Sequence, residues 1–460
     1  MVETQDSHPK ITGRARAIHV LGIESSCDDT GVAIVRSDGK ILSNCIHSQL
    51  KNHLSLGGII PMIAKDYHLA NIDSVARKAF MESNLRSVGE DIDAIAVTNR
   101  PGLDYSLRVG LHYARQLAKK YSKPLLPIHH MQAHALMPLL ESRSVRFPFM
   151  ALLLSGGHCL ISICKRFNEF HLLGHALDEA PGDTLDKVAR RCRLKNLGPP
   201  FDEMSGGAAL ELLSQRPNAN RFKHFSASEN IPMLAIQNCD LSFSGYRGSF
   251  DKLTAEIDAL WEQGNREKLL DELGSIAGSL QRAMMVQVIK KLQRAIAYYR
   301  MHWRHNNPDA FVHSPMGSGG EKEWLPFKCR TSDDNEYLDL VISGGVAANR
   351  YFVSTIEQVC KQDFDESINV YAPSKGLCSD NGLMIAWNGM LRYLDYLNNA
   401  STGDRETGAL DEGVIVDQAE MDLVAARPVW PIGLDIRKQV GLADFRLIRL
   451  RNPELKLNCS

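Results

Sequence analysis

The chain has 460 residues, a length that exceeds the usual single hydrophobic core and therefore predicts two lobes. Its net charge of −1 lacks the strongly basic balance typical of many nucleic-acid binders, so any contact with RNA must use a local basic patch. The 10 cysteines are scattered without a C-x-x-C pair, which argues against a disulfide framework and against a structural zinc cluster. No apolar run reaches the ~18 residues that a membrane span requires.

The first 18 residues form a polar tail ahead of the first apolar run. Lys10, Arg14 and Arg16 are typical of a mitochondrial transit peptide, whereas Glu3 and Asp6 are not, because such peptides avoid acidic residues. We therefore expect residues 1–18 to be a targeting segment or a disordered tail.

A predicted hairpin follows this tail. Apolar runs at 20–24 and 31–35 flank a small and acidic turn at 25–30, which is the pattern of two strands joined by a turn. The elements expected next are a helix at 68–80, a strand at 92–98, a helix at 109–119 and a strand at 125–128. This alternation predicts an α/β lobe over residues 19–147.

A second hairpin of the same design starts at residue 150. Apolar runs at 150–154 and 159–163 flank a turn of small and polar residues. The repeated hairpin indicates two similar lobes around a cleft. We place the second lobe at 148–395, and a polar linker with a C-terminal tail at 396–460.

The second half also contains a long amphipathic segment and a polar one. Apolar residues recur at helical spacing over 269–292, which predicts a helix of the hydrophobic core. The stretch 302–335 is rich in glycine, proline, histidine and charge, and we expect it to be an exposed insertion.

Two histidines form a candidate metal site. His130 and His134 are four residues apart, so on a helix both imidazoles lie on one face, one turn apart. This spacing suits one divalent metal ion, with room for a carboxylate and a substrate. Two ordinary histidines are the alternative. Asp380 precedes an apolar helix and is either the N-cap of that helix or the missing hard ligand.

Glycine turns and one acidic residue form a candidate nucleotide site. The turn 155–158 and the segment 343–350 each follow a predicted strand and offer backbone N–H groups that can approach a phosphate. A tight hairpin turn is the alternative for the first. Asn349 could then bind a ligand hydroxyl or amide. Asp186 either accepts hydrogen bonds from ribose hydroxyls or adds a favourable charge to the start of a helix.

In their order, these segments resemble the Kae1/TsaD/Qri7 family from about residue 20 to the end of the chain. No single motif is specific, but the ordered set is. The motifs are GIESSCDDT at 22–30, HHMQAH at 129–134, SGGH at 155–158, DTLDK at 183–187, LSFSG at 241–245, GGVAANR at 344–350 and SDN at 379–381.

The resemblance implies a two-lobed α/β fold of the actin/Hsp70/sugar-kinase (ASKHA) type. It implies that His130, His134 and Asp380 hold one divalent metal ion per subunit, zinc or iron. Asp28 and Asp29 become candidates to assist proton removal. The residues implied to contact the adenylate substrate are Leu154, Ser155, Gly156, Gly157, His158, Asp186, Gly207 and Asn349.

The reaction implied is transfer of a threonylcarbamoyl group from threonylcarbamoyl-AMP to N6 of adenosine 37 in tRNAs that read codons beginning with A (t6A formation). A Sua5-type synthase would supply the adenylate. Asp183 and the segments 204–207 and 433–436 resemble the mitochondrial branch. That branch implies a mitochondrial location and a homodimer without membrane association, and a cytoplasmic location is the alternative.

Two departures from the family pattern and one basic run bear on these expectations. Gln132 stands where the family usually has Glu, which is expected to change the surroundings of the histidines, and Arg100 stands where many members have Gly. For contact with the tRNA anticodon loop, the densest basic run is Lys187, Arg190, Arg191, Arg193 and Lys195. A solvated helix face is the alternative.

Three other classes of function are compatible with parts of the sequence. A thermolysin-type metalloprotease needs Glu directly after the first histidine, where Met131 stands. An actin-fold kinase fits the repeated hairpins but gives His130 and His134 no role. A binding module without catalysis would not need the full set of candidate ligands.

Overall fold

The structure is a computed structural model that describes residues 16–225, 231–233, 235–311, 337–364, 367–402, 415–416 and 420–443. Most of the predicted tail 1–18 and of the insertion 302–335, and about half of the linker and tail 396–460, lie outside the described residues. The boundaries of the predicted lobes therefore stay a prediction.

The first sheet has the strand order β3-β2-β1-β4-β5. Strands β1, β2 and β3 form an antiparallel meander, whereas β4 and β5 run parallel to β1. The bounds are β1 His19–Glu24, β2 Asp29–Arg36, β3 Ile41–Ser48, β4 Ala94–Arg100 and β5 Leu125–His129. The predicted hairpin is the β1–β2 pair.

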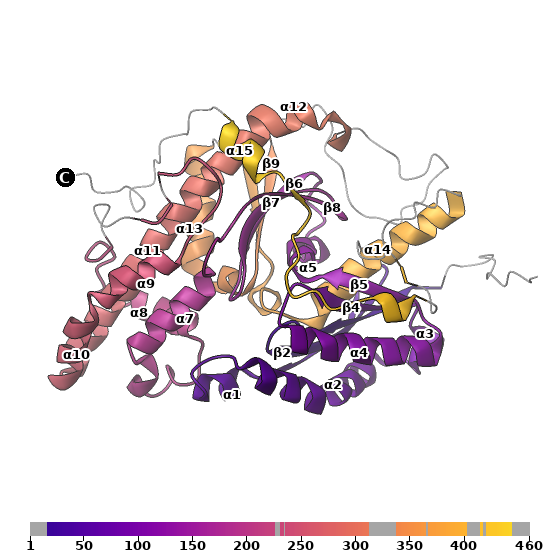
Figure 1. Ribbon diagram of the computed structural model, residues 1–460, viewed down its shortest axis with the longest axis horizontal. Coiled ribbons are helices and arrows are strands. Elements are labelled where there is room, and N and C mark those ends of the chain that lie inside the picture. Colours follow the sequence, from indigo (N-terminus) through magenta and orange to yellow (C-terminus); the bar gives the residue numbers. More distant parts are fainter. Residues whose placement is uncertain are drawn as a thin grey trace, which may run out of the picture.

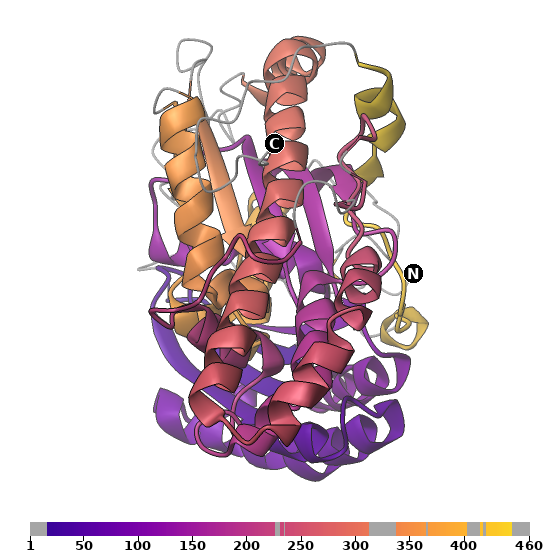
Figure 2. The same ribbon diagram turned by 90° about the vertical axis from the view of Figure 1, so that its left-hand side faces the viewer.

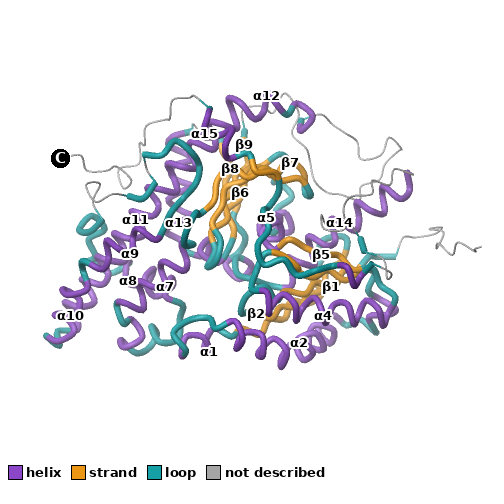
Figure 3. The backbone as a smooth tube through the Cα atoms, viewed as in Figure 1, coloured by secondary structure: helices purple, strands orange, loops and turns teal. Residues whose placement is uncertain are grey.

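The second sheet repeats this arrangement. Strands β6, β7 and β8 form an antiparallel meander, and β9 and β10 run parallel to β6, in the order β10-β9-β6-β7-β8-β11. The bounds are β6 Phe149–Leu154, β7 Cys159–Arg166, β8 Glu169–His175, β9 Leu338–Ser343, β10 Ile368–Tyr371 and β11 Leu434–Asp435. The same five-strand pattern occurs twice, and the fold is the expected two-lobed actin/Hsp70/sugar-kinase type (Figure 3).

Helices cover both faces of the first sheet. Helices α2 (Pro61–Ser83) and α4 (Asp104–Tyr121) pack on one face, and α14 (Gly382–Thr402) packs on the other (Figure 1). Helix α14 thus packs on the first sheet, although most of its residues lie within the range expected for the second lobe. Glycines allow this close approach, because a Cβ at Gly22 would lie 2.2 Å from the backbone nitrogen of Ala386.

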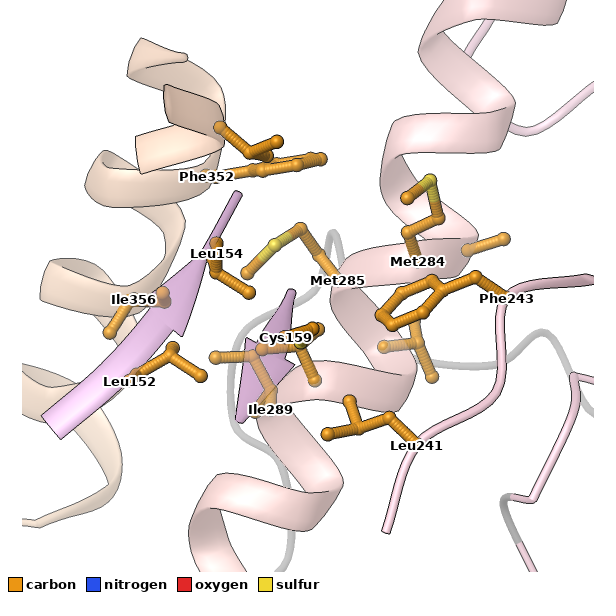
Figure 4. Packing of buried hydrophobic residues seen from close by; sticks show 14 of the residues in the cluster. Leu152, Leu154, Cys159, Leu241, Phe243, Met284, Met285, Ile289, Phe352 and Ile356 are labelled. Carbon is orange, nitrogen blue, oxygen red and sulfur yellow. The ribbon is translucent and has the colours of Figure 1, made fainter. Parts of the chain in front are cut away.

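The second sheet is backed by a long buried helix. Helix α11 (Arg266–Tyr298) includes the predicted 269–292 and lies beside α13 (Arg350–Asp363) (Figure 2). Met285 and Ile289 of α11 point toward Leu154 and Leu152 of β6, and Met284 lies beside Phe243 (Figure 4). This contact explains the long apolar face that the sequence displays.

The polar stretch after α11 does not begin as an exposed segment at His302. The helix continues through one π-turn, Tyr299–Trp303, into α12 (Arg304–Asn306). Trp303 is only 1% exposed, and its Nε1 donates to Nδ1 of His171 at 2.8 Å. The aromatic ring therefore holds this turn against the second sheet.

The remaining helices are short. They are α1 Leu50–Ser55, α3 Val88–Asp91, α5 His130–Leu136, α6 Pro138–Glu141, α7 Pro181–Arg191, α8 Gly206–Ser214, α9 Ser244–Asp251, α10 Thr254–Glu262 and α15 Arg437–Leu442. Helix α5 contacts strands of both sheets. Among the described helices, none is long and apolar enough to cross a membrane.

Candidate metal and substrate site

Helix α5 begins where strand β5 ends, and His129 marks the junction. Its Nδ1 accepts from the backbone nitrogens of Met131 at 3.2 Å and Gln132 at 3.4 Å, so His129 is the N-cap. Its Nε2 donates to the carbonyl oxygen of Pro431 at 3.1 Å. Burial holds the pKa of His129 well below its usual value. His129 is therefore a neutral structural residue with both nitrogens occupied.

The next residue of this helix, His130, faces Asp380 together with His134. Nε2 of His134 lies 3.0 Å from Oδ1 of Asp380, and Nε2 of His130 lies 3.5 Å from the same oxygen. The three ligand atoms lie within 4.8 Å of one another. Although burial raises the pKa of Asp380, the two histidines lower it below its usual value, so this carboxylate is ionised.

Asp380 is not the cap of the helix that follows it. That position belongs to Asn381, whose side-chain oxygen accepts from the backbone nitrogen of Met384 at 2.9 Å. The carboxylate of Asp380 is thereby left to the histidines. Two imidazole nitrogens and one carboxylate oxygen form a set that suits zinc or ferrous iron, with further coordination positions open.

Glu24 contacts one of the candidate metal ligands, although its position in the sequence did not single it out. It is fully buried at the end of β1, and its Oε2 lies 3.1 Å from Nδ1 of His130 and accepts from Oγ1 of Thr98 at 2.6 Å. Despite burial, Asp380 and Glu24 raise the pKa of His130 to about 9. A carboxylate on Nδ1 fixes the ring so that Nε2 points to the metal position. The sequence feature that could have indicated Glu24 is an acidic residue at the end of an otherwise apolar strand.

The substitution Glu24→Gln is expected to weaken divalent-metal binding by roughly 10-fold or more, because a neutral amide makes His130 a less basic ligand. The measurement is a Zn²⁺ competition titration with a chromophoric chelator. Thr98→Val is the control, because it removes a partner of Glu24 and keeps the pair with His130. Equal affinity in E24Q and the unmodified protein would contradict this role.

The glycine turn joins β6 to β7 at the same cleft. Oγ of Ser155 accepts from the backbone nitrogen of His158 at 2.9 Å, which closes the turn. Gly156 and Gly157 are exposed, and a Cβ on either would meet no atom within 4 Å. Burial and the neighbouring His130 lower the pKa of His158 to about 4, so it is neutral. The turn thus presents unobstructed backbone to the cleft.

Asp29 begins β2, Asp28 directly precedes it, and both line the cleft. Burial, followed by the charge of Asp28, raises the pKa of Asp29 to about 7. Burial also raises the pKa of Asp28. Oδ1 of Asp29 has no hydrogen-bond partner among the described residues. A carboxylate with this pKa is suited to accept a proton near neutral pH.

The remaining predicted contacts differ in how far they reach the cleft. Asp186 lines it, and its Oδ1 accepts from the backbone nitrogen of Gly207 at 3.2 Å. The side chain of Asn349 caps α13 by accepting from the nitrogen of Tyr351 at 3.0 Å and donates to Gln281 at 2.8 Å. Among the described residues, the lining of the cleft does not include Leu154, Gly207 or Asn349.

The cleft has a volume of about 1290 Å³ and is lined by residues of both lobes. The predicted site residues that line it are Asp28, Asp29, His130, Ser155, Gly156, Gly157, His158, Asp186 and Asp380. His134 is fully buried behind them. The two lobes thus bring residues that are as far apart in the sequence as Asp28 and Asp380 into the same cleft.

Gln132 does not contact the two histidines' ligand atoms. Its amide donates to the carbonyl oxygen of Ile432 at 3.1 Å, and its side-chain oxygen accepts from Arg392 at 2.7 Å. The replacement of the usual Glu by Gln at this position therefore changes contacts with α14 and with the C-terminal segment, and not with the two histidines.

The basic run on and after α7 is largely paired. Arg191 lies 2.6 Å from Asp251, Arg193 pairs with Asp258, and Lys187 lies 2.7 Å from Asp183. Arg190 donates to the carbonyl oxygen of Gly57, and Lys195 donates to that of Leu54, so both reach across to the first lobe. Arg191 and Arg193 remain about half exposed.

The duplicated lobes and the ligand set at their interface define a two-lobed cleft enzyme with a candidate metal site. Residues 40–387 match the family model described as tRNA N6-adenosine threonylcarbamoyltransferase, and the chain belongs to this family. The family expected from the motifs is thereby confirmed. The match also decides against the protease, kinase and non-catalytic alternatives.

Curated relatives agree with this assignment over nearly the whole chain. The mitochondrial tRNA N6-adenosine threonylcarbamoyltransferase of Mus musculus is 38% identical over 433 residues, which cover 94% of this chain and 90% of the relative. The protein of the same name from Xenopus tropicalis is 41% identical over 417 residues, which cover 90% and 92%. These names confirm the expected mitochondrial location.

One solved structure with a similar chain path is component A of (R)-2-hydroxyglutaryl-CoA dehydratase from Acidaminococcus fermentans. The TM-score is 0.41 and the identity 13%, and the match covers 83% of this chain and 99% of that one.

Proposed function

We propose that the protein transfers the threonylcarbamoyl group of threonylcarbamoyl-AMP to N6 of adenosine 37 in mitochondrial tRNAs that read codons beginning with A. The observation that carries this proposal is the meeting of a His–His–Asp ligand set and an open glycine turn in one cleft of a chain that belongs to this family. A Sua5-type synthase supplies the adenylate, and the protein acts as a homodimer.

One divalent metal ion, zinc or iron, is held by His130, His134 and Asp380. When bound, it supplies Lewis acidity that offsets charge developing on substrate oxygens. Glu24 supports this assignment, because it holds the ring of His130 with Nε2 toward Asp380.

The adenylate is bound by residues of the second lobe. Backbone N–H groups of Gly156 and Gly157 bind the phosphate, where the open glycine turn permits close approach. Ser155 shapes this turn, because its backbone nitrogen donates to the carbonyl oxygen of His158 at 2.8 Å. The carboxylate of Asp186 binds the ribose. His158 lines the cleft beside this turn. Leu154, Gly207 and Asn349 lie outside the cleft lining and act through the end of β6 and the starts of α8 and α13.

The reaction forms a bond between adenine N6 and the carbamoyl carbon, and the bond from that carbon to the AMP oxygen breaks. The N6 proton goes to Asp29, whose pKa of about 7 suits a general base, because burial and then the charge of Asp28 raise that pKa. Adenine N6 is a poor nucleophile, so the positioning of both substrates in the cleft contributes much of the rate.

The anticodon loop binds near the mouth of the cleft, where the basic run lies. The triple substitution of Arg190, Arg191 and Arg193 by Ala is expected to weaken tRNA binding and to reduce the slope of log K against log salt by about 2, since each lost phosphate contact contributes ~0.7. Filter binding or fluorescence anisotropy across salt concentrations measures both quantities.

A matched triple variant removes the same charge elsewhere. Arg77, Lys78 and Arg86 are exposed and each is also paired with a carboxylate, and they lie outside the cleft lining. Their replacement by Ala is expected to leave the affinity and the slope nearly unchanged. Unchanged tRNA binding in the Arg190/Arg191/Arg193 variant would reject this basic run as the contact surface.

The proposed function is tested by a transfer assay with purified protein, unmodified tRNA, threonine, bicarbonate, ATP and a Sua5-type synthase. Mass spectrometry of the digested tRNA is expected to find threonylcarbamoyladenosine at position 37 only when both proteins are present. Absence of product in the complete mixture would count against the function or against action without a further protein.

A further inference from the structure

A C-terminal strap, residues 420–436, crosses from the first lobe to the second (Figure 1). On the first lobe, the backbone nitrogen of Arg427 donates to the carbonyl oxygen of Asn99 at 2.8 Å, and that of Gly102 donates to the carbonyl oxygen of Pro428 at 3.1 Å. On the second lobe, Leu434–Asp435 pairs with β8 as strand β11. The strap is thus tied by backbone hydrogen bonds at both ends.

Between these ties, two successive carbonyl groups of the strap contact helix α5. The carbonyl oxygen of Pro431 accepts from Nε2 of His129, and that of Ile432 accepts from the amide of Gln132, both at 3.1 Å. His129 directly precedes His130, and Gln132 lies between His130 and His134 in the sequence. The strap therefore holds the turn of helix that carries both histidines.

Gln132 extends this connection to helix α14. Its side-chain oxygen accepts from Nη2 of Arg392 at 2.7 Å, and Nε of Arg392 donates to Asn388 at 2.8 Å. Gln132 and Arg392 are both buried. Because α14 starts two residues after Asp380, one glutamine links the strap, the helix of the two histidines and the helix that follows the third candidate ligand.

The strap is fixed in register by packing. The guanidinium carbons of Arg427 and Arg100 lie 4.2 Å and 6.0 Å from the ring centre of Trp430. The side chain of Ile432 is 2% exposed. At Gly433 the backbone approaches β8 so closely that a Cβ would lie 2.1 Å from the carbonyl oxygen of Phe170. These contacts leave the carbonyls of 431 and 432 little freedom.

We propose that this strap, acting through Gln132 and His129, positions helix α5 and thereby sets the geometry of His130 and His134. Helix α5 has only seven residues, and so short a helix does not hold its own orientation in water. The expected consequence for metal affinity stands on the geometry alone, whereas the consequence for tRNA modification rests on the proposed function. Gln132 and His129 are positioning residues, which act through the histidines.

The test is the variant Gln132→Glu. A glutamate, the residue usual in the family, retains an acceptor for Arg392 but cannot donate to the carbonyl oxygen of Ile432 when ionised. In this chain, the tie of residue 132 to the strap is therefore lost, whereas the tie of His129 to Pro431 remains. Three results are expected: faster amide hydrogen exchange over residues 425–436, a Kd for Zn²⁺ that rises by about 10-fold, and a lower kcat with an unchanged KM for tRNA. Val429→Ala is the matched control, because Val429 lies on the same strap and is 88% exposed.

The double variant Gln132→Met/Arg392→Met removes both hydrogen-bonding partners without leaving a buried charge, and it is expected to weaken Zn²⁺ binding as well. Two outcomes overturn the proposal. Faster exchange in the strap with unchanged Zn²⁺ affinity would mean that the strap docks without positioning α5. Weaker Zn²⁺ binding with unchanged exchange would mean that Gln132 acts within α5 alone. If the unmodified protein forms no product but the Zn²⁺ and exchange results hold, the proposed function fails and the positioning role stands.

Discussion

The double variant His130→Ala/His134→Ala is expected to form threonylcarbamoyladenosine at least ~100-fold more slowly than the unmodified protein, and to bind no stoichiometric divalent metal. Two of the three candidate ligands are lost, and Asp380 alone offers one carboxylate oxygen. Glu24 also loses the imidazole that faces it in the core. The product is measured by mass spectrometry and the metal by elemental analysis of the purified protein.

A control variant shows whether the loss belongs to the site. His112 and His305 are exposed and lie outside the cleft lining, so their double replacement by Ala is expected to change neither activity nor metal content. Thermal unfolding of both double variants separates loss of fold from loss of metal. Full activity in the His130/His134 variant would keep the enzyme and reject the histidines as ligands.

The second large effect is expected for Gly156→Ala, with kcat/KM for threonylcarbamoyl-AMP reduced by about 10- to 100-fold. A Cβ at this position meets no protein atom within 4 Å, so it enters only the open space of the cleft. If that space holds the adenylate phosphate, the methyl group displaces it from the backbone N–H groups. The free energy of unfolding is expected to change by less than ~0.5 kcal/mol. Single-turnover kinetics with prepared adenylate gives the rate, and denaturant unfolding gives the stability.

Gly248→Ala is the matched control for this substitution. Gly248 also has no atom within 4 Å of an added Cβ, but it lies in α9 and outside the cleft lining. Its replacement by Ala is expected to leave kcat/KM unchanged and to stabilise the helix by up to ~1 kcal/mol. Normal kinetics in G156A would show that the glycine turn is a hairpin turn only.

Local patterns in the sequence predict the sheets well, because strand alternation and small polar turns are short-range features. The two hairpins at 20–35 and 150–163 identify β1–β2 and β6–β7, and their repetition indicates the duplicated lobes. The packing of α14 on the first sheet could not be predicted in this way. It depends on the close contact between Gly22 and Ala386, which are far apart in the chain.

The candidate site shows the same division. The spacing of His130 and His134 predicts a shared helix face, and the sequence leaves Asp380 as either a third ligand or a helix cap. The structure places Asp380 beside the two histidines. Asn349 illustrates what spacing cannot resolve, because one asparagine after a glycine turn suits both a ligand contact and a helix cap, and its side chain caps α13. Glu24 and the strap depend on buried contacts between distant segments, which leave little periodic trace in a single sequence.

The position of α14 in the chain has a consequence for how this protein matures. Strands β1, β2 and β4 are made early, but the apolar face formed by Val20, Ala33 and Ala96 is covered by α14, which starts only at residue 382. A growing or partly imported chain therefore displays an uncovered sheet and a pair of histidines without Asp380. The first lobe cannot be completed by vectorial folding, so its closure and the assembly of the metal ligands wait for the same late segment.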